Sequence, residues 1–283
     1  MQFFSYLING ISLGSVYALI ALGYTMVYGI AKMLNFAHGD VIMIGSYVVY
    51  FAFGASGLNP VLSIILSMIV CTILGVVIER LAYRPLREAP SLAVLITAIG
   101  VSYLLQQVAQ LSWSSNPKSF TSVVSGMKPV SLFGGQLTIS AETIVTIVAC
   151  VVIMVVLMWF VNYTPAGHAM LAVSEDRGAA QLMGVNVNGT ISLTFAIGSA
   201  LAAIAGALLC SSYPTLQPTT GAMPGIKAFV AAVFGGILLG IIENLSKAYI
   251  STQLSDAIVF LVLVVVLIVK PTGLLGKKVN VKV

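Results

Sequence analysis

The chain has 283 residues, of which 59% are hydrophobic and only 7% are charged. Soluble domains carry roughly 25% charged residues, so this composition predicts a membrane protein. It excludes a large soluble helical protein, which would still need charged outer faces. The net charge of +5 does not indicate a nucleic-acid partner, because the basic residues fall in separate loops and form no stripe along a face.

Apolar runs bounded by charged residues or Gly/Pro clusters predict about eight spans, since one crossing takes about 20 apolar residues. We place them near residues 4–28, 41–56, 60–78, 91–111, 141–161, 190–211, 228–245 and 255–269. The predicted fold class is an all-α polytopic transmembrane helix bundle that forms a single domain over residues 1–283. Turn-forming residues from Gly54 to Pro60 predict a hairpin between the second and third spans.

Basic residues in short loops predict the orientation. Arg80, Arg84 and Arg87 follow the third span and lysines follow the last span, so the positive-inside rule places both regions in the cytoplasm. Alternation of the spans from the first cluster places the 162–189 loop, with Arg177, in the cytoplasm as well. Eight full crossings would instead leave the last lysines outside. We therefore expect 228–245, which glycines interrupt, to be a broken or re-entrant segment.

A candidate functional segment lies between the first two spans. Asn35, His38, Gly39 and Asp40 bring together an amide, an imidazole and a carboxylate. A catalytic His/Asp pair is disfavoured, because a spacing of two does not share a helix face and no nucleophile motif adjoins it. The residues can cap backbone groups between two helices. Alternatively, a broken-helix junction lines a translocation path, together with Gly235 and Gly236.

Sites for enzymatic chemistry are missing from the sequence. It has no phosphate-binding loop, no zinc-protease motif and no nucleophile elbow, and its three cysteines are too widely spaced for a metal cluster. We therefore predict no catalytic residue, no metal site and no cofactor site. Glu243 and Lys247, four residues apart, predict an ion pair on one helix face. Asp256 is expected to cap the last span or to lie in its first turn.

The loop at 162–189 contains a predicted cytoplasmic helix near residues 174–186. Acidic residues stand at its start, small and apolar residues follow, and Gly184 ends it. This helix either lies on the lipid headgroups or is bound by a cytoplasmic partner.

Several motifs resemble the permease subunits of bacterial branched-chain amino acid ABC transporters. The stretch from Asn35 to Asp40 is similar to the N-F-A-H-G-D/E stretch after the first span of that family, and Ala179-Ala180-x-x-x-Gly184 resembles part of the EAA loop by which ABC permeases dock on their ATPases. Further matches lie at 84–90, 97–100, 227–236 and 270–276. The resemblance therefore extends over nearly the whole chain.

The chain also departs from the family pattern. Gly178 stands where the EAA loop has its Glu, and Leu171 stands where an Arg is expected. A G-S-x-P-G-A turn and further glycines usually follow the Gly-Gly pair in this family, but Gly240 and Glu243 follow it almost directly here. The departure falls within the predicted re-entrant segment.

The resemblance implies inward passage of leucine, isoleucine or valine across the bacterial inner (plasma) membrane, driven by ATP that partner subunits bind. Implied partners are a second related permease subunit, two ATP-binding cassette ATPases, an extracytoplasmic substrate-binding protein and membrane lipid. The implied ATPase-coupling residues are Glu175, Asp176, Arg177, Ala179, Ala180, Leu182, Met183 and Gly184. The alternative is an ATP-independent channel or facilitator for a small polar solute such as urea, which should show charge rings or a carbonyl filter. A membrane enzyme comes third.

Overall fold

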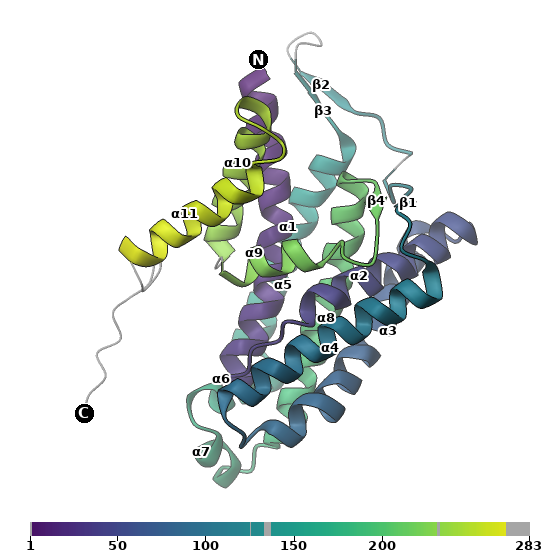
Figure 1. The fold of residues 1–283 in the computed structure, drawn as a ribbon. Helices are drawn as coiled ribbons and strands as arrows, with labels where there is room; N and C mark the ends of the chain where they lie inside the picture. Colours follow the sequence, from purple (N-terminus) through teal and green to yellow (C-terminus); the bar gives the residue numbers. More distant parts are fainter. Residues whose placement is uncertain (1, 125, 133–136, 231–232, 270–283) are drawn as a thin grey trace.

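The computed structural model describes residues 2–124, 126–132, 137–230 and 233–269, and Figure 1 shows it as a helical bundle. Within these ranges, five helical segments are long and apolar enough to cross a membrane. They contain α1 (Gln2–Ala31), α3 (Pro60–Ile78), α4 (Ser91–Trp113), α5 (Ala141–Tyr163) and α8 (Val187–Ser212). The predicted all-α polytopic bundle is confirmed.

Shorter helices make up the rest of the bundle. The second predicted span is α2 (His38–Val49), which continues as the π-helical turn η1 (Tyr50–Ala55). After α3, the chain winds through η2 (Glu79–Tyr83) and η3 (Arg84–Leu86). The remaining helices are α6 (Pro165–Glu175), α7 (Arg177–Leu182), α9 (Ala222–Val230), α10 (Val233–Tyr249) and α11 (Ser255–Val269).

In the described ranges, four short strands lie outside the predicted spans. β1 (Lys118–Ser119) pairs antiparallel with β4 (Thr215–Leu216). β2 (Val130–Leu132) pairs antiparallel with β3 (Leu137–Ile139). Each pair contains few residues, so the strands tie loops together and do not change the fold class.

The predicted hairpin between α2 and α3 is present. Gly57 adopts φ +68°, a left-handed conformation that glycine takes without a Cβ clash. The side chain of Asn59 then caps α3 by accepting a 3.0 Å hydrogen bond from the backbone N–H of Val61, and Pro60 is the first residue of the helix. Local chemistry therefore determines where α3 begins.

The long helices differ in burial. In their most apolar stretches, α1 is 83% and α8 is 72% buried, whereas α4 is 17% and α5 only 11% buried. Glycines let the buried helices approach closely: a Cβ on Gly14 would lie 2.6 Å from the Cα of Ile237, and one on Gly206 would lie 2.5 Å from the carbonyl oxygen of Ile42. Helices α1 and α8 therefore form the core, and the apolar faces of α4 and α5 suit contact with lipid.

The segment that contains α9 and α10 enters and leaves the bundle at the same end. α9 packs deep in the bundle, where the ring of Phe229 lies 5.5 Å from that of Tyr24. α10 then runs antiparallel to α1 until Asn244 donates a 2.8 Å hydrogen bond to the carbonyl of Tyr6. Figure 1 shows α9 lying across the bundle and α10 rising beside α1. The fold therefore contains the predicted re-entrant segment, and α11 starts from the end that α10 reaches.

The re-entrant segment is longer than the predicted 228–245, because its helices begin at Ala222 and end at Tyr249. Residues 231 and 232, between the two helices, lie outside the described residues, as do the lysines of the C-terminal tail.

Candidate functional site

The loop helix α7 has well-defined ends. The Asp176 side chain accepts hydrogen bonds from the backbone N–H groups of Gly178 (2.8 Å) and Ala179 (3.0 Å), so it caps the helix. At the other end, Gly184 has φ +87° and donates its N–H to Gln181, while the next N–H donates to Ala180. These paired bonds form a Schellman cap. The glycine end and an acidic start at Asp176 are therefore present, but the helix is shorter than the predicted 174–186, because Ser174 and Glu175 belong to α6.

The residues of α7 and its C-terminal turn divide into an exposed and a buried set. Leu182 and Met183 are 89% and 84% exposed, whereas Ala180 is only 4% exposed. Figure 1 shows α7 at the end of the molecule opposite the N-terminus, beyond the long helices. Two large apolar side chains therefore project from this end and can contact a partner or lipid.

Polar contacts attach the loop to the bundle. Arg177 donates to the carbonyl of Ala31 at the C-terminal end of α1, where a cation also interacts favourably with the helix dipole. Burial and the positive charge of Arg87 lower the pKa of Arg177 below its usual range. Both arginines line a cavity of about 300 Å³ between the loop and α8.

A buried carboxylate lies near this cavity. Glu79 is fully buried, pairs with Arg87 and accepts a 2.7 Å hydrogen bond from Ser192 on α8. Arg87 also bonds Asn188 at the start of α8. The loop end of the bundle is therefore joined by charged contacts between η2, its following turn and α8.

The predicted path residues near the start of α2 lie in contacts between helices. Asn35 accepts a 2.9 Å hydrogen bond from the hydroxyl of Tyr83, and Asp40 accepts one of 2.9 Å from Gln106 on α4. The ring of His38 lies 4.5 Å from that of Tyr24, and its Nε2 has no hydrogen-bond partner in the described part of the chain. These contacts satisfy most of the polar groups and hold α2 against its neighbours.

The predicted glycines also lie at close contacts. A Cβ on Gly39 would lie 2.6 Å from the carbonyl oxygen of Gly221, and one on Gly236 would lie 2.8 Å from the backbone nitrogen of Ala18. Gly235 is the neighbour of Gly236 in α10. Among the described residues, the cavities of about 260, 510 and 300 Å³ are lined by none of the six predicted path residues, so the role of these residues in a path stays a prediction.

A network of ion pairs centred on the buried side chains of Lys227 and Glu243 lies toward the opposite end of the bundle from α7. The ammonium of Lys227 on α9 lies 2.7 Å from Glu243 on α10 and 2.6 Å from Asp256 on α11. Glu243 also pairs with Lys247 at 2.7 Å and accepts a 2.8 Å hydrogen bond from the Tyr17 hydroxyl. The predicted Glu243–Lys247 pair and the place of Asp256 in the first turn of α11 are confirmed.

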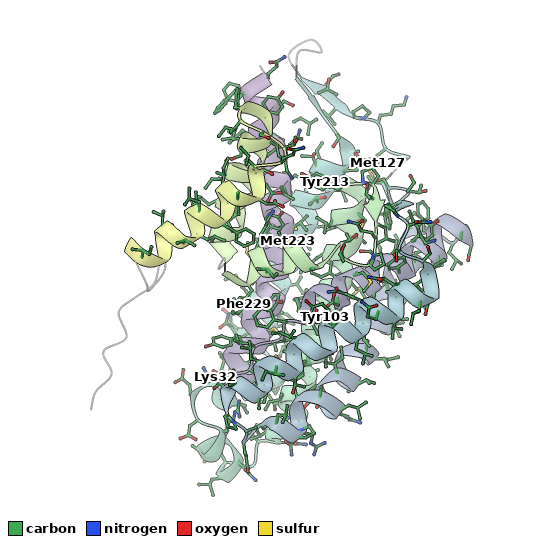
Figure 2. All side chains as sticks on the ribbon, in the orientation of Figure 1. Lys32, Tyr103, Met127, Tyr213, Met223 and Phe229 are labelled. Carbon is green, nitrogen blue, oxygen red and sulfur yellow. The ribbon has the colours of Figure 1, made fainter. Side chains whose placement is uncertain are left out.

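Two cavities adjoin this network. One, of about 260 Å³, is lined by all four charged residues and by Tyr17 and Tyr213. The other, of about 510 Å³, is lined mainly by hydroxyl and amide side chains from α1, α5, α8 and α10, and it shares Leu13 and Tyr213 with the first. Figure 2 shows Tyr213 in the part of the molecule where α8 and the re-entrant segment meet. Polar cavities therefore accompany the charges at this end.

The comparisons with known proteins agree with this architecture. A family model described as "Branched-chain amino acid transport system / permease component" matches residues 6–267. The chain belongs to this permease family. It is 42% identical to the high-affinity branched-chain amino acid transport system permease protein LivH of Salmonella typhimurium, over 98% of this chain and 96% of LivH.

Other relatives extend the family. The permease BraD of Pseudomonas aeruginosa is 42% identical over 96% of this chain and 95% of BraD. The fructose import permease FrcC of Rhizobium meliloti is 28% identical over 65% of this chain and 50% of FrcC. Family membership and the apolar helices make this chain a multi-pass protein of the bacterial inner membrane.

This family member also lacks residues that a relative has. The match with LivH extends over 299 aligned positions, which is more than the 283 residues of this chain. LivH therefore has residues for which this chain has no counterpart. The resemblance described above suggests one such stretch, directly after Gly236.

Sequence reasoning missed the centre of the buried network. Lys227 stands out in the sequence only as part of a family resemblance, although it bonds two carboxylates on different helices. A signal was available, because an ionisable residue within an apolar segment faces the bundle interior and has a partner there. The partner could not be identified from local spacing, since Glu243 and Asp256 follow in separate helices.

Proposed function

We propose that this chain is the membrane permease subunit of an importer that moves branched-chain amino acids into the cell. The observation that carries the proposal is the match to LivH and BraD at 42% identity over nearly the whole of each chain. Such coverage includes every described helix, so the likeness concerns the transport domain as a whole. The alternative, a urea channel, has no supporting observation.

Energy for import comes from separate ATPase subunits, because the sequence contains no phosphate-binding loop. The exposed side chains of Leu182 and Met183 fit an apolar cleft on such a subunit. Asp176 and Gly184 fix the shape of α7, Ala180 packs it inward, and Arg177 joins it to α1. A movement of the ATPase would therefore be passed to the core helix of the bundle.

The remaining coupling residues have supporting roles. Glu175 ends α6 and Ala179 lies on the exposed side of α7, next to Gly178, where the family pattern has Glu. With Gly178 in place of the Glu, this position contributes no side-chain charge to the contact with the ATPase. Nucleotide binding shifts the bundle between outward and inward access only by its differential affinity for the two states.

The complete importer, in this proposal, also contains a second permease subunit and an extracytoplasmic binding protein. The binding protein delivers substrate at the bundle end that carries the N-terminus of α1, the β-strand pairs and the two polar cavities. The ATPases bind at the opposite end, where Arg80, Arg84, Arg87 and Arg177 gather in agreement with the positive-inside rule.

Uptake of labelled leucine into proteoliposomes tests the proposal. The vesicles contain this chain with its partner permease and ATPases, and the binding protein is added outside. We expect leucine to accumulate only when ATP is available to the ATPases. Leucine flux that is equal with and without ATP would contradict the importer and favour a channel.

A further inference from the structure

The 260 Å³ cavity at the outer end combines charges of both signs with apolar surface. Lys227 and Lys247 contribute two ammonium groups, and Glu243 and Asp256 contribute two carboxylates. The formal charges sum to zero. Ionisable side chains within a membrane bundle are costly and usually mark functional positions.

Two members of the network have little capacity for another ligand. Glu243 accepts from Tyr17, Lys227 and Lys247, and Lys227 donates to Glu243 and Asp256. The side chains of Lys227 and Glu243 are each only 3% exposed. Lys227 and Glu243 are therefore buried and bonded within the network, and a ligand in the cavity would have to bind the other two charged residues.

The two outer members retain capacity on the cavity side. The Asp256 side chain is 47% exposed and the Lys247 side chain 29% exposed. The ammonium of Lys247 has three donors, of which one bonds Glu243 in the described part of the chain. Asp256 uses Oδ1 to bond Lys227. A spare acceptor and spare donors therefore line the same cavity.

We propose that this cavity binds the α-ammonium and α-carboxylate groups of a neutral amino acid during its passage through the bundle. Asp256 accepts from the ammonium and Lys247 donates to the carboxylate. The apolar side chain of the amino acid lies against Leu13, Leu209 and Pro224, which also line the cavity. This inference rests on the proposed function and adds a binding site to it.

Charge and size both favour a small neutral amino acid. A zwitterion adds no net charge to a network that is already neutral, whereas a cationic or anionic amino acid would leave one charge without a partner. A volume of about 260 Å³ lies below the roughly 300–1,000 Å³ of pockets for drug-sized ligands. The adjoining 510 Å³ cavity shares Leu13 and Tyr213 with this one and is lined mainly by hydroxyl and amide side chains, together with the carboxylate of Glu142.

Protection of an introduced thiol tests the site without changing any charge. Thr252 lines the cavity, whereas its neighbour Gln253 is exposed and does not line it. The native cysteines Cys71, Cys150 and Cys210 are buried and unpaired. We compare Thr252→Cys with Gln253→Cys in the complete complex in proteoliposomes, using a membrane-impermeant thiol reagent.

We expect leucine to slow labelling of Thr252→Cys at least fivefold and to leave Gln253→Cys unchanged. Leucinamide, which lacks the carboxylate, and 4-methylpentanoate, which lacks the ammonium, should not protect. Protection of both thiols alike, of neither thiol, or by all three compounds equally would overturn the site.

Substitution of the two outer charges gives an independent measurement. Lys247→Gln and Asp256→Asn should each raise the KM for leucine uptake at least tenfold, and Lys247→Arg should restore most of the loss. Lys118→Gln, which removes a cation from β1 outside the cavity, is the matched control. An unchanged KM in both variants would overturn the site.

Failure of the site and failure of the proposed function give different results. If the unaltered complex takes up leucine with ATP, yet Thr252→Cys is not protected and the KM values are normal, only the site is wrong. If the unaltered complex takes up no leucine with ATP, the proposed function is wrong as well.

Discussion

The two ends of this permease present their charged and apolar groups in opposite ways. In the proposed orientation, the end that carries Lys227 and Glu243 is the outer end and the end that carries α7 is the inner end. At the outer end, Lys227 and Glu243 are buried and bonded to each other, and they join helices α9, α10 and α11 to α1. At the inner end, Leu182 and Met183 are left exposed on a short helix with strong caps. The difference teaches that the outer end supports itself, whereas the inner end has apolar groups that this chain does not cover among its described residues.

Substitutions at the outer end should therefore affect stability, and substitutions at the inner tip should affect coupling. We expect the losses of stability to decrease in order from the buried network, through the close helix contacts, to the caps and exposed tip of α7.

Lys227→Met should cause the largest loss. It removes the cation between two carboxylates and leaves Glu243 buried with one fewer partner, and breaking a buried pair costs about 3–5 kcal/mol. We expect a much lower unfolding midpoint for the purified complex and less chain in the membrane. Lys118→Met is the control for loss of a lysine. Equal midpoints for both variants would show that the network does not support the outer end.

Gly14→Ala should cost about 1–3 kcal/mol through overpacking. The new Cβ would lie 2.6 Å from both the Cα and the carbonyl oxygen of Ile237, so α1 and α10 must separate. Gly29→Ala in the same helix is the control, because no atom lies within 4 Å of its Cβ position. Thermal unfolding of the two variants measures the difference, and a smaller loss for Gly14→Ala would contradict the packing.

Much of the fold follows from local sequence, and so do the two ends of α7. Asp176 and Gly184 lie eight residues apart and limit α7, so their roles can be predicted from a short stretch. The start of α3 at Asn59 and Pro60 follows in the same way. Apolar runs also predict the long helices, because the bilayer sets their length.

The outer network could not be predicted in this way. The Tyr17 hydroxyl meets Glu243, which lies 226 residues later in the chain. Only the return of α10 along α1 brings the two together, and no local spacing indicates that register. The spacing of four between Glu243 and Lys247 was enough to predict one pair but not the residues that complete the network.

Asp176→Ala should cost about 1 kcal/mol, confined to α7, because two N–H groups lose their capping acceptor. Faster hydrogen exchange at Gly178 and Ala179 measures the effect. Glu175→Ala removes a neighbouring charge without removing the cap and serves as the control. Equal exchange in both variants would show that Asp176 does not hold the helix.

The double variant Leu182→Asp, Met183→Asp should change stability by less than about 0.5 kcal/mol, since both side chains are exposed. Its effect should instead fall on transport. Tyr163→Asp, at the exposed end of α5 on the same side of the bundle, is the control for adding a charge there.

The most direct test of the account is the rate of ATP hydrolysis by the reconstituted complex when leucine-loaded binding protein is added. We predict stimulation in the unaltered complex and in Tyr163→Asp, and none in the Leu182→Asp, Met183→Asp variant at equal membrane content. Full stimulation and normal uptake in that variant would contradict the claim that the exposed tip of α7 couples this permease to its ATPases.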